Sequence, residues 1–574
     1  MALIASFAAS AQNFPKVQDE YSKALTARSD VTRLDPDQMF GDSIGLYTGS
    51  LEFLQTDAIL PGNNGLEVAI RRKLKMGERP LADNFYRGWQ LAIPSIHGVF
   101  SEAHGWSTSK GSDPSKRCSN FWWPAAEVVK ANSGVASTKV FLPEEFWFGT
   151  FLYLPSSGDQ PIFNSYNYDG TDFGWPRPTD GASYPLRTKD GYVISCIPSE
   201  DGTSEGFEVH TTDGVVYRIN HMAIRPMVPL LKSEYWVSQG SQQLVQWVMK
   251  RQEYVLLVTS ARDRFGNTVT YDWDPSNPWQ LKSIRASDGR RLDLTWSGGQ
   301  VAEVRSGDKV WSYSENRIIY PDKSYWDFTS MDLSAASYDE GSVPGNHSHC
   351  YYPGDPTTKK MHAVMRHPSG AIATFDAAPT LHGRSQTPDS CGTKYDPNTN
   401  FWDNSSEAYP ATYYLWSVTS KSISGPGLSA PLTWTYSYSP ANGCYKSPNQ
   451  MGTNTCTSSS PSTKWVDVTD PSGIVARYTF GNQYSVSEGF LLSTVQPGRE
   501  VTQEYSHANE EGFLGWAGIL AMPPRSNPGG LMGLISPIKK KVIIQDGERF
   551  EWTVTAYDKM ARPLSITKSS APQQ

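Results

Sequence analysis

The stretch of sequence that decides the fold runs from residue 263 to residue 272 and reads Asp263-Arg264-Phe265-Gly266-Asn267-Thr268-Val269-Thr270-Tyr271-Asp272. Its first half is rich in turn-forming residues, and Gly266 supplies the backbone freedom that a tight turn needs. In its second half apolar and polar side chains alternate, which is the two-residue period of a strand with one buried face. The stretch therefore predicts a tight turn that leads directly into a β-strand.

The same unit recurs along the chain. Counted from its glycine, each copy has an apolar residue at positions +3 and +5 and a polar residue between them. The six copies begin at Gly214, Gly266, Gly289, Gly370, Gly473 and Gly547. The residues Asp470-Pro471-Ser472-Gly473 match the preferences of a type I turn, with Asp first, Pro second and Gly fourth. Each unit is thus predicted to be a turn that feeds a strand, with its alternate side chains in one core.

The spacing of these units favours a repeat architecture. Gly266 and Gly289 are 23 residues apart, which falls in the range of known repeat periods. The other intervals are longer and require insertions or degenerate units, such as residues 322–328, where Lys323 stands in place of the glycine. The alternative is chance, because any β protein has Asp-Gly turns before alternating strands. Six copies favour the repeat.

These residues resemble the RHS/YD-repeat family. The unit at 263–272, with the segments that follow it, is similar to the family's repeat, although one Tyr-x pair is missing. Further segments resemble the start of bacterial RHS proteins or one more repeat; they are Thr48–Leu51, Asp57–Gly62, Ile70–Arg72, Tyr86–Trp89 and Tyr557–Pro563. The resemblance covers roughly residues 40–567. It implies a β-strand spiral that forms a hollow shell, in secreted, cell-surface or toxin-delivery proteins of bacteria.

The chain departs from that family in two respects. The family's Asp-Pro-x-Gly core closes the shell and marks self-cleavage, whereas Asp470–Gly473 lies inside the repeat region and is interpreted as a turn. No toxin-like segment follows the last repeat, and the sequence stops at Ala571-Pro572-Gln573-Gln574. We therefore expect the N-terminal portion of an RHS-type shell, open or incomplete, or a short or decayed member. Encapsulation and autoproteolysis are not expected.

The composition supports an all-β fold with antiparallel hairpins. The 574 residues include 12% aromatic side chains, 47 glycines and 40 prolines, but only 19% charged residues. Aromatic side chains favour strands and glycine and proline favour turns, whereas a disordered chain has few aromatics and a high net charge. No run of 18 apolar residues predicts a transmembrane helix. The net charge of −7 argues against nucleic acid as the primary partner.

The chain is expected to divide into five parts. Residues 1–11 are interpreted as the remnant of a signal peptide or as an ordinary Ala-rich start, because Ala9-Ser10-Ala11 fits a cleavage site but no basic n-region precedes it. An irregular segment follows at 12–40, then an N-terminal β region at 41–230 that introduces the shell. Repeats with insertions are expected at 231–567 and a tail at 568–574.

Six cysteines without a CxxC motif suit an oxidising compartment. We expect a disulfide between Cys444 and Cys456, because they bracket a loop rich in Asn, Gly, Ser and Pro. A bond between Cys350 and Cys391 is a weaker hypothesis of the same kind. Cys118 and Cys196 have no assigned partner, and buried free thiols are the alternative for all six.

The sequence contains no convincing catalytic constellation. His347-Ser348-His349-Cys350 groups metal-capable side chains but lacks a second ligand pair at metal-site spacing, so a polar loop is the preferred interpretation. The carboxylate pairs Glu144-Glu145 and Asp339-Glu340 would point to opposite faces of a strand. The G-x-S-x-G stretches at 41–45 and 202–206 lack the strand and helix that a nucleophile elbow requires.

Two functional hypotheses follow. The first is a secreted or cell-surface β-repeat scaffold used in intercellular interaction or toxin delivery, with no enzymatic activity, no cofactor and no metal. Its partner would be an unknown protein or cargo, or a cell-envelope glycan. The second is a secreted carbohydrate-binding or carbohydrate-active β protein. It predicts exposed aromatic side chains beside a carboxylate pair in one cleft, whereas the first predicts aromatic side chains buried in register.

Overall fold

The structure is a computed structural model that describes residues 39–76, 85–109, 111–131, 136–141, 143–147, 149–166, 172, 174–238, 241–330, 360–388, 393–396, 401–404, 411–446, 455–484, 486–506, 512–513 and 535–572. Regular structure in these ranges is almost entirely β-strand, beside the four-residue helix α2 (Pro143–Phe146), so the expected all-β class is confirmed. The same ranges contain no helix with the length and apolar character needed to cross a membrane. The proposed signal remnant at 1–11 and the segment up to residue 38 lie outside the described residues.

The first body is a four-stranded antiparallel sheet, here called the N-terminal sheet. Its strands occur in chain order: β1 (Asp42–Gly45), β2 (Ser50–Leu60), β3 (Val68–Lys75) and β4 (Gln90–Leu91). Leu51 and Phe53 on β2 are buried, whereas Glu52 and Leu54 between and beside them are exposed. This alternation gives the sheet one apolar face for the core and one mixed face.

The second body is a closed antiparallel barrel. Its strands pair in order and close because β14 pairs with β5: β5 (Ser95–Ser101), β8 (Thr150–Leu154), β9 (Gly158–Asn164), β10 (Leu186–Thr188), β11 (Val193–Pro198), β12 (Glu205–His210), β13 (Val216–Ser238) and β14 (Ser241–Arg262). The hairpin of β6 (Glu127–Lys130) and β7 (Thr138–Phe141) packs against β14. The sequence did not predict this closure.

The third body continues from β14 as a long antiparallel sheet, here called the wall. Its strands pair in chain order: β15 (Thr268–Asp274), β16 (Asn277–Ala286), β17 (Arg291–Ser297), β18 (Gln300–Ser306), β19 (Lys309–Tyr313), β20 (Arg317–Ile319), β21 (Tyr325–Ser330), β22 (Met361–Arg366), β23 (Ile372–Gly383), β27 (Thr412–Ser424), β28 (Leu432–Tyr438), β30 (Thr463–Thr469), β31 (Val475–Gly481), β32 (Leu491–Gln496), β33 (Arg499–Tyr505), β34 (Ile538–Gln545), β35 (Glu548–Tyr557) and β36 (Pro563–Pro572). Two small sheets lie in its connections, namely β24 (Thr387–Pro388) with β29 (Tyr445–Lys446) and β25 (Thr393–Asp396) with β26 (Phe401–Asn404).

The predicted turns are present. All six glycines of the units have φ between 81° and 93°, a conformation that strongly favours glycine. At Gly266 the amide donates to the carbonyl of Asp263 at 3.1 Å, and the Asp263 carboxylate accepts the amides of Phe265 and Asn267 at 2.9 Å. Lys323 has φ 71°, and its amide donates a hydrogen bond to the carbonyl of Tyr320 at 2.9 Å, so it occupies the glycine position of a seventh turn.

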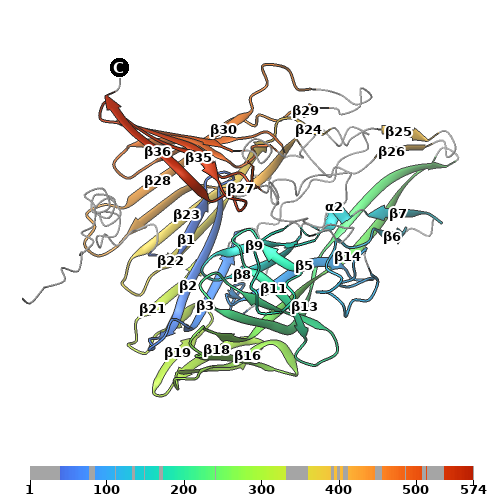
Figure 1. Ribbon diagram of the computed structural model, residues 1–574, viewed down its shortest axis with the longest axis vertical. Helices are drawn as coiled ribbons and strands as arrows, with labels where there is room; N and C mark the ends of the chain where they lie inside the picture. Colours follow the sequence, from blue (N-terminus) through green and yellow to red (C-terminus); the bar gives the residue numbers. More distant parts are fainter. Residues whose placement is uncertain are drawn as a thin grey trace, which may run out of the picture.

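The N-terminal sheet lies against the first part of the wall (Figure 1). Its apolar face meets the +3 and +5 side chains of the units: Phe53 packs edge-on against Phe375 with ring centroids 5.0 Å apart. At the neighbouring strands Phe40 meets Trp326 and Phe85 meets Trp296. The main core therefore lies between these two layers and continues into the barrel.

Burial of the wall decreases along the chain. Val269, Leu292 and Phe375 are buried as the units predict. Tyr478 and Trp552 in the last two units are only half-buried, and Phe550 is 46% exposed. These later units do not lie in the main core with the earlier ones, because the side chains that cover the first strands come from the N-terminal sheet.

Two disulfides occur among the described residues. The predicted bond between Cys444 and Cys456 is confirmed, and Cys118 pairs with Cys196, a bond that the sequence did not predict. The free-thiol alternative is wrong for these four residues. Cys350 and Cys391 lie outside the described residues, so that pairing stays a prediction.

Candidate functional site

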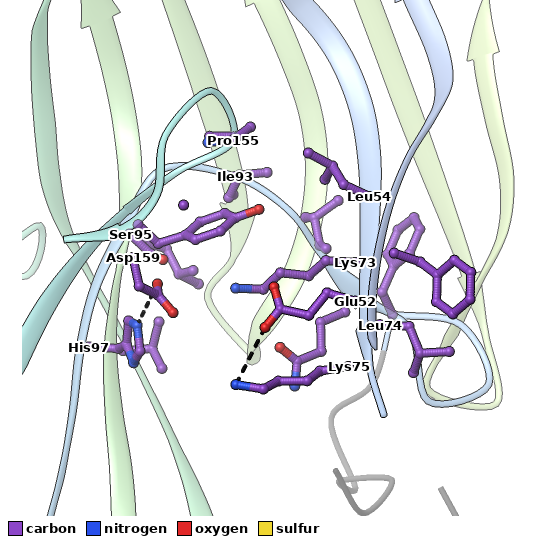
Figure 2. Close-up of a pocket in the computed structure, with 18 of the residues that line it drawn as sticks. Glu52, Leu54, Lys73, Leu74, Lys75, Ile93, Ser95, His97, Pro155 and Asp159 are labelled. Carbon is purple, nitrogen blue, oxygen red and sulfur yellow. Dashed lines mark hydrogen bonds and ion pairs between the residues drawn. The ribbon is translucent and has the colours of Figure 1, made fainter. Parts of the chain in front are cut away.

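A cavity of about 320 Å³ lies between the mixed face of the N-terminal sheet and the outer face of the barrel; it is here called the inter-sheet pocket. Figure 2 shows Glu52, Lys73 and Lys75 on one side of it and His97 and Asp159 on the other. These residues come from β2 and β3 on the first side and from β5 and β9 on the second. The pocket is the space that the side chains of these two layers leave unfilled.

Strand alternation places the barrel side chains. Ile96 on β5 and Leu256 on β14 are fully buried in the core, and they are cross-strand partners. Because neighbouring residues on a strand point to opposite faces, His97 is directed outward, toward the pocket. The partner strand directs Val255 the same way, and Glu253 two residues earlier shares this face.

His97 is held between two carboxylates. Its Nε2 lies 3.1 Å from Oδ1 of Asp159 and its Nδ1 lies 3.0 Å from Oε1 of Glu253. The ring also stacks on Phe151, with centroids 5.7 Å apart. Burial lowers the pKa of His97, but the hydrogen bonds and charges of Asp159 and Glu253 outweigh burial and raise it to about 9. The side chain is therefore an imidazolium at neutral pH, with both N–H groups used.

The carboxylates of this group stay ionised. Burial raises the pKa of Glu253, but the hydrogen bond from His97 and the charge of Arg225 outweigh it and lower the pKa to about 2. Arg225 donates its Nε–H to the other oxygen of Glu253. Burial also raises the pKa of Asp159, yet His97, Lys73 and Lys75 together hold it below its ordinary value.

The opposite side carries a looser arrangement. The Nζ atom of Lys73 lies 3.5 Å from the centroid of the Tyr153 ring, a cation–π contact. Lys75 and Glu52 form a cross-strand ion pair at 3.5 Å, and both side chains are about half exposed. His97, Asp159 and Glu253, whose pKa values are shifted, thus keep their charges at neutral pH. Groups with fixed charges are better suited to hydrogen bonding of a ligand than to proton transfer.

A second polar cluster lies where the N-terminal sheet meets β23, β27 and β30. Lys464 Nζ lies 3.0 Å from Nδ1 of His382, whose Nε2 lies 2.9 Å from Oγ of Ser417. Burial, with the charge of Lys464, lowers the pKa of His382 to about 3, and burial lowers that of Lys464 to about 8.

This cluster resembles a Ser–His pair, but its hydrogen bonds run the wrong way for a nucleophile. The Lys464 ammonium donates to Nδ1 of His382, so Nε2 carries the proton and donates to Ser417. The Ser417 hydroxyl in turn donates to the carbonyl of Thr48 at 2.6 Å. Ser417 is fully buried, so the cluster anchors the β1–β2 turn to the wall.

Analysis of the sequence did not identify any of the pocket's charged residues as site residues. Their signal is weak, because His97, Asp159 and Glu253 are far apart in the chain and belong to no motif. Among the described residues no group of three or more His, Cys, Asp or Glu side chains could hold a metal ion. The fixed charges come together only through the pairing of β5 with β8 and β14.

The structure places the sequence candidates apart from one another. Ser43 lies on β1 beside the pocket, and Ser204 lies in a bend before β12. Neither is followed by a helix in the described part of the chain, so both lack the context of a nucleophile elbow. The Gly473 turn is an ordinary turn before β31, as predicted, with Gly473 N–H bonded to the carbonyl of Asp470 at 2.9 Å.

Other candidates fall outside the described residues. They are His347, His349, Cys350, Asp339, Glu340 and the side chains of Glu144 and Glu145.

No family model matches this chain. No curated protein matches it either. Among solved structures it is similar to the N-terminal domain of effector protein SpvB from Salmonella typhimurium strain LT2, at 11% identity over 69% of this chain and 94% of that one, with a TM-score of 0.17. It is also similar to a chain of the TcdB2-TccC3-Cdc42 crystal structure, at 9% identity over 92% of this chain and 26% of that one, with a TM-score of 0.15. Similarity at these TM-scores does not support an argument about function.

Proposed function

We propose that this chain is a non-catalytic β-strand scaffold, secreted or exposed at the cell surface, whose wall binds a protein partner or cargo. The use that we propose for it is that of an RHS-type shell portion in intercellular interaction or toxin delivery. The observation that carries the proposal is the wall itself: successive turn–strand units pair in chain order, and their apolar side chains lie on one face.

The later strands of the wall support a binding role. Strand pairing puts Tyr478, Val501, Phe550 and Trp552 on the same face, and of these only Val501 is buried. Ile566 on β36 is cross-strand partner to Val554 and is 45% exposed. A run of half-exposed apolar side chains on one sheet face is the kind of surface that a protein partner covers.

The disulfides support the proposed location. Cys118–Cys196 and Cys444–Cys456 would be reduced in most cytosols, whereas they persist in secreted and envelope proteins. The pocket chemistry supports the absence of catalysis in the proposal, because the charges of His97 and Glu253 do not change near neutral pH.

The test is co-expression of the chain with the proteins encoded beside its gene, followed by size-exclusion chromatography with light scattering. We expect one of them to form a stable complex and to slow hydrogen exchange in β31–β36. Phe550→Ser and Ile566→Ser should weaken that complex at least tenfold, whereas Phe265→Ser, at a turn tip where the side chain is 77% exposed, should not. A complex that is indifferent to Phe550 and Ile566, or the absence of any complex, would contradict the proposal.

A further inference from the structure

The inter-sheet pocket has the features of a binding site that the scaffold proposal does not use. Its volume of about 320 Å³ is at the small end of the range for small-molecule sites, roughly 300–1,000 Å³. The N-terminal sheet forms one side and the barrel the other, so a ligand would touch both. The chemistry of the two sides then decides which class of ligand fits.

Most charged side chains of the pocket are paired with one another. His97 pairs with Asp159 and Glu253, Arg225 pairs with Glu253, and Lys75 pairs with Glu52. Each carboxylate thus has a cationic partner, and Lys73, the fourth cation of the lining, lies over the Tyr153 ring, so a charged ligand meets groups that already have partners. A strongly charged ligand would have to break an existing pair, and leaving a buried charge without its partner is costly.

Accessible hydrogen-bonding groups of both kinds nevertheless remain. Asp159 contacts His97 through Oδ1, and its side chain is 48% exposed, which leaves acceptor capacity. Across the pocket Glu52 is 56% and Lys75 is 51% exposed, and their contact of 3.5 Å is loose. An ammonium group has three donors, so Lys75 can serve a ligand and Glu52 together. Acceptors and donors thus face one another across the cavity.

Apolar surface lies between these polar groups. Ile93, Pro155 and Leu54 line the same cavity, and the Leu54 side chain is exposed on the N-terminal sheet. Trp279 lines it as well, but Arg225 lies 5.3 Å from its ring centroid, so part of that ring is already in contact with a cation. A ligand for this pocket must therefore combine C–H surface with several hydroxyl groups that both donate and accept.

We propose that the inter-sheet pocket binds a neutral saccharide, with sugar hydroxyl groups hydrogen-bonded to Asp159 on the barrel side and to Glu52 and Lys75 on the N-terminal sheet. A sugar hydroxyl donates to a carboxylate and accepts from an ammonium group at the same time, which matches the two kinds of group found here. The sugar's C–H surface would lie against Pro155 and Leu54, which are more exposed than Ile93. This inference does not depend on the proposed partner-binding strands β31–β36, none of which lines the pocket.

The experiment uses the full chain on an array of neutral glycans, followed by calorimetric titration with the best-bound disaccharide. Glu52→Ala and Lys75→Ala each remove a charged hydrogen-bonding group, so each should weaken binding by about tenfold or more. The matched control is Lys250→Ala, which breaks a solvent-exposed ion pair with Glu102 at the barrel and should leave the dissociation constant unchanged. The side chains of both ion pairs are at least 42% exposed, so the three variants should keep the thermal midpoint of the parent protein.

The competing ligand class is tested in the same titration. Inorganic phosphate at millimolar concentration should not bind the pocket or displace the disaccharide. Displacement by phosphate would show an anion site and overturn the proposal. So would the absence of any bound neutral glycan, or a loss of binding in Lys250→Ala equal to that in Lys75→Ala.

Discussion

The buried ion pair between Arg72 and Asp57 should be one of the strongest attachments of the N-terminal sheet. The Nε atom of Arg72 lies 3.0 and 3.1 Å from the two oxygens of Asp57, and Tyr313 of the wall donates to the same carboxylate at 2.9 Å. Neither charged side chain is exposed. The guanidinium also lies 4.0 Å from the ring centroid of Trp89. Arg72→Met would leave Asp57 buried without its cation.

A second Arg–Asp ion pair, at the protein surface, serves as the comparison. Arg477 and Asp467 are also cross-strand neighbours, with contacts of 2.7 and 2.8 Å, and Arg477 lies 4.1 Å from the ring of Trp465. The Arg477 side chain, however, is 47% exposed. Each arginine contacts both oxygens of its aspartate and stacks on a tryptophan, although Arg72 uses Nε alone and Arg477 uses Nε and Nη2. The largest difference between the two pairs is burial.

The two substitutions are expected to lower the free energy of unfolding by amounts that differ several-fold. Removing one partner of a buried pair costs about 3–5 kcal/mol, whereas an exposed pair contributes roughly 1 kcal/mol or less. We expect urea unfolding, followed by tryptophan fluorescence, to show this difference between Arg72→Met and Arg477→Met. Burial already raises the pKa of Asp57, so the Arg72→Met loss should shrink as pH falls and that carboxyl is protonated. Equal losses in the two variants would refute the reasoning.

Three further predictions concern single features. The pKa of His97 is about 9 in the fold against 6.5 in the unfolded chain, so ionisation of His97 adds about 3 kcal/mol to the free energy of unfolding. This stabilisation is complete below pH 6.5 and is lost as pH rises through 9. The denaturant midpoint of His97→Gln should lack this pH dependence. Breaking the Cys444–Cys456 bond by replacing both residues with Ser should cost about 2–3 kcal/mol, measured by the same unfolding assay under non-reducing conditions. Lys323→Gly should raise the thermal midpoint, because position 323 has positive φ. Gly266→Lys should lower the thermal midpoint and reduce the free energy of unfolding by about 1–2 kcal/mol, because position 266 also has positive φ.

The turns were predictable because they are local. Gly266 and Gly473 are the fourth residue of a turn that begins with Asp, a position where type I turns favour glycine, and all six predicted glycines have positive φ. Burial of the +3 and +5 side chains was predictable only where another layer covers them. Val269 and Phe375 are buried, but Tyr478 and Trp552 are not, because burial depends on which distant strand lies opposite.

The closed barrel and the inter-sheet pocket were not predictable for the same reason. Closure requires β14 to pair with β5, more than 140 positions earlier in the chain, and no local pattern specifies that partner. The two carboxylates around His97 belong to no motif and meet it only through strand pairing, Glu253 because β14 pairs with β5 and Asp159 because β8 pairs with both β5 and β9. Periodicity reports which face of a strand is apolar, but not which strand will meet it.

The position of the N-terminal sheet links the pocket to the early strands of the wall and separates it from the proposed partner surface. It covers the apolar face of the early wall strands and at the same time forms one side of the pocket, so its attachment holds the pocket together. Asp42 on β1 pairs with Lys421 on β27 at 2.7 Å, and both side chains are almost fully buried. A variant that loosens this sheet, such as Arg72→Met, should therefore weaken saccharide binding in proportion to its loss of stability. A substitution on β36, such as Ile566→Ser, should affect the protein partner alone, because β36 is remote from the pocket's lining.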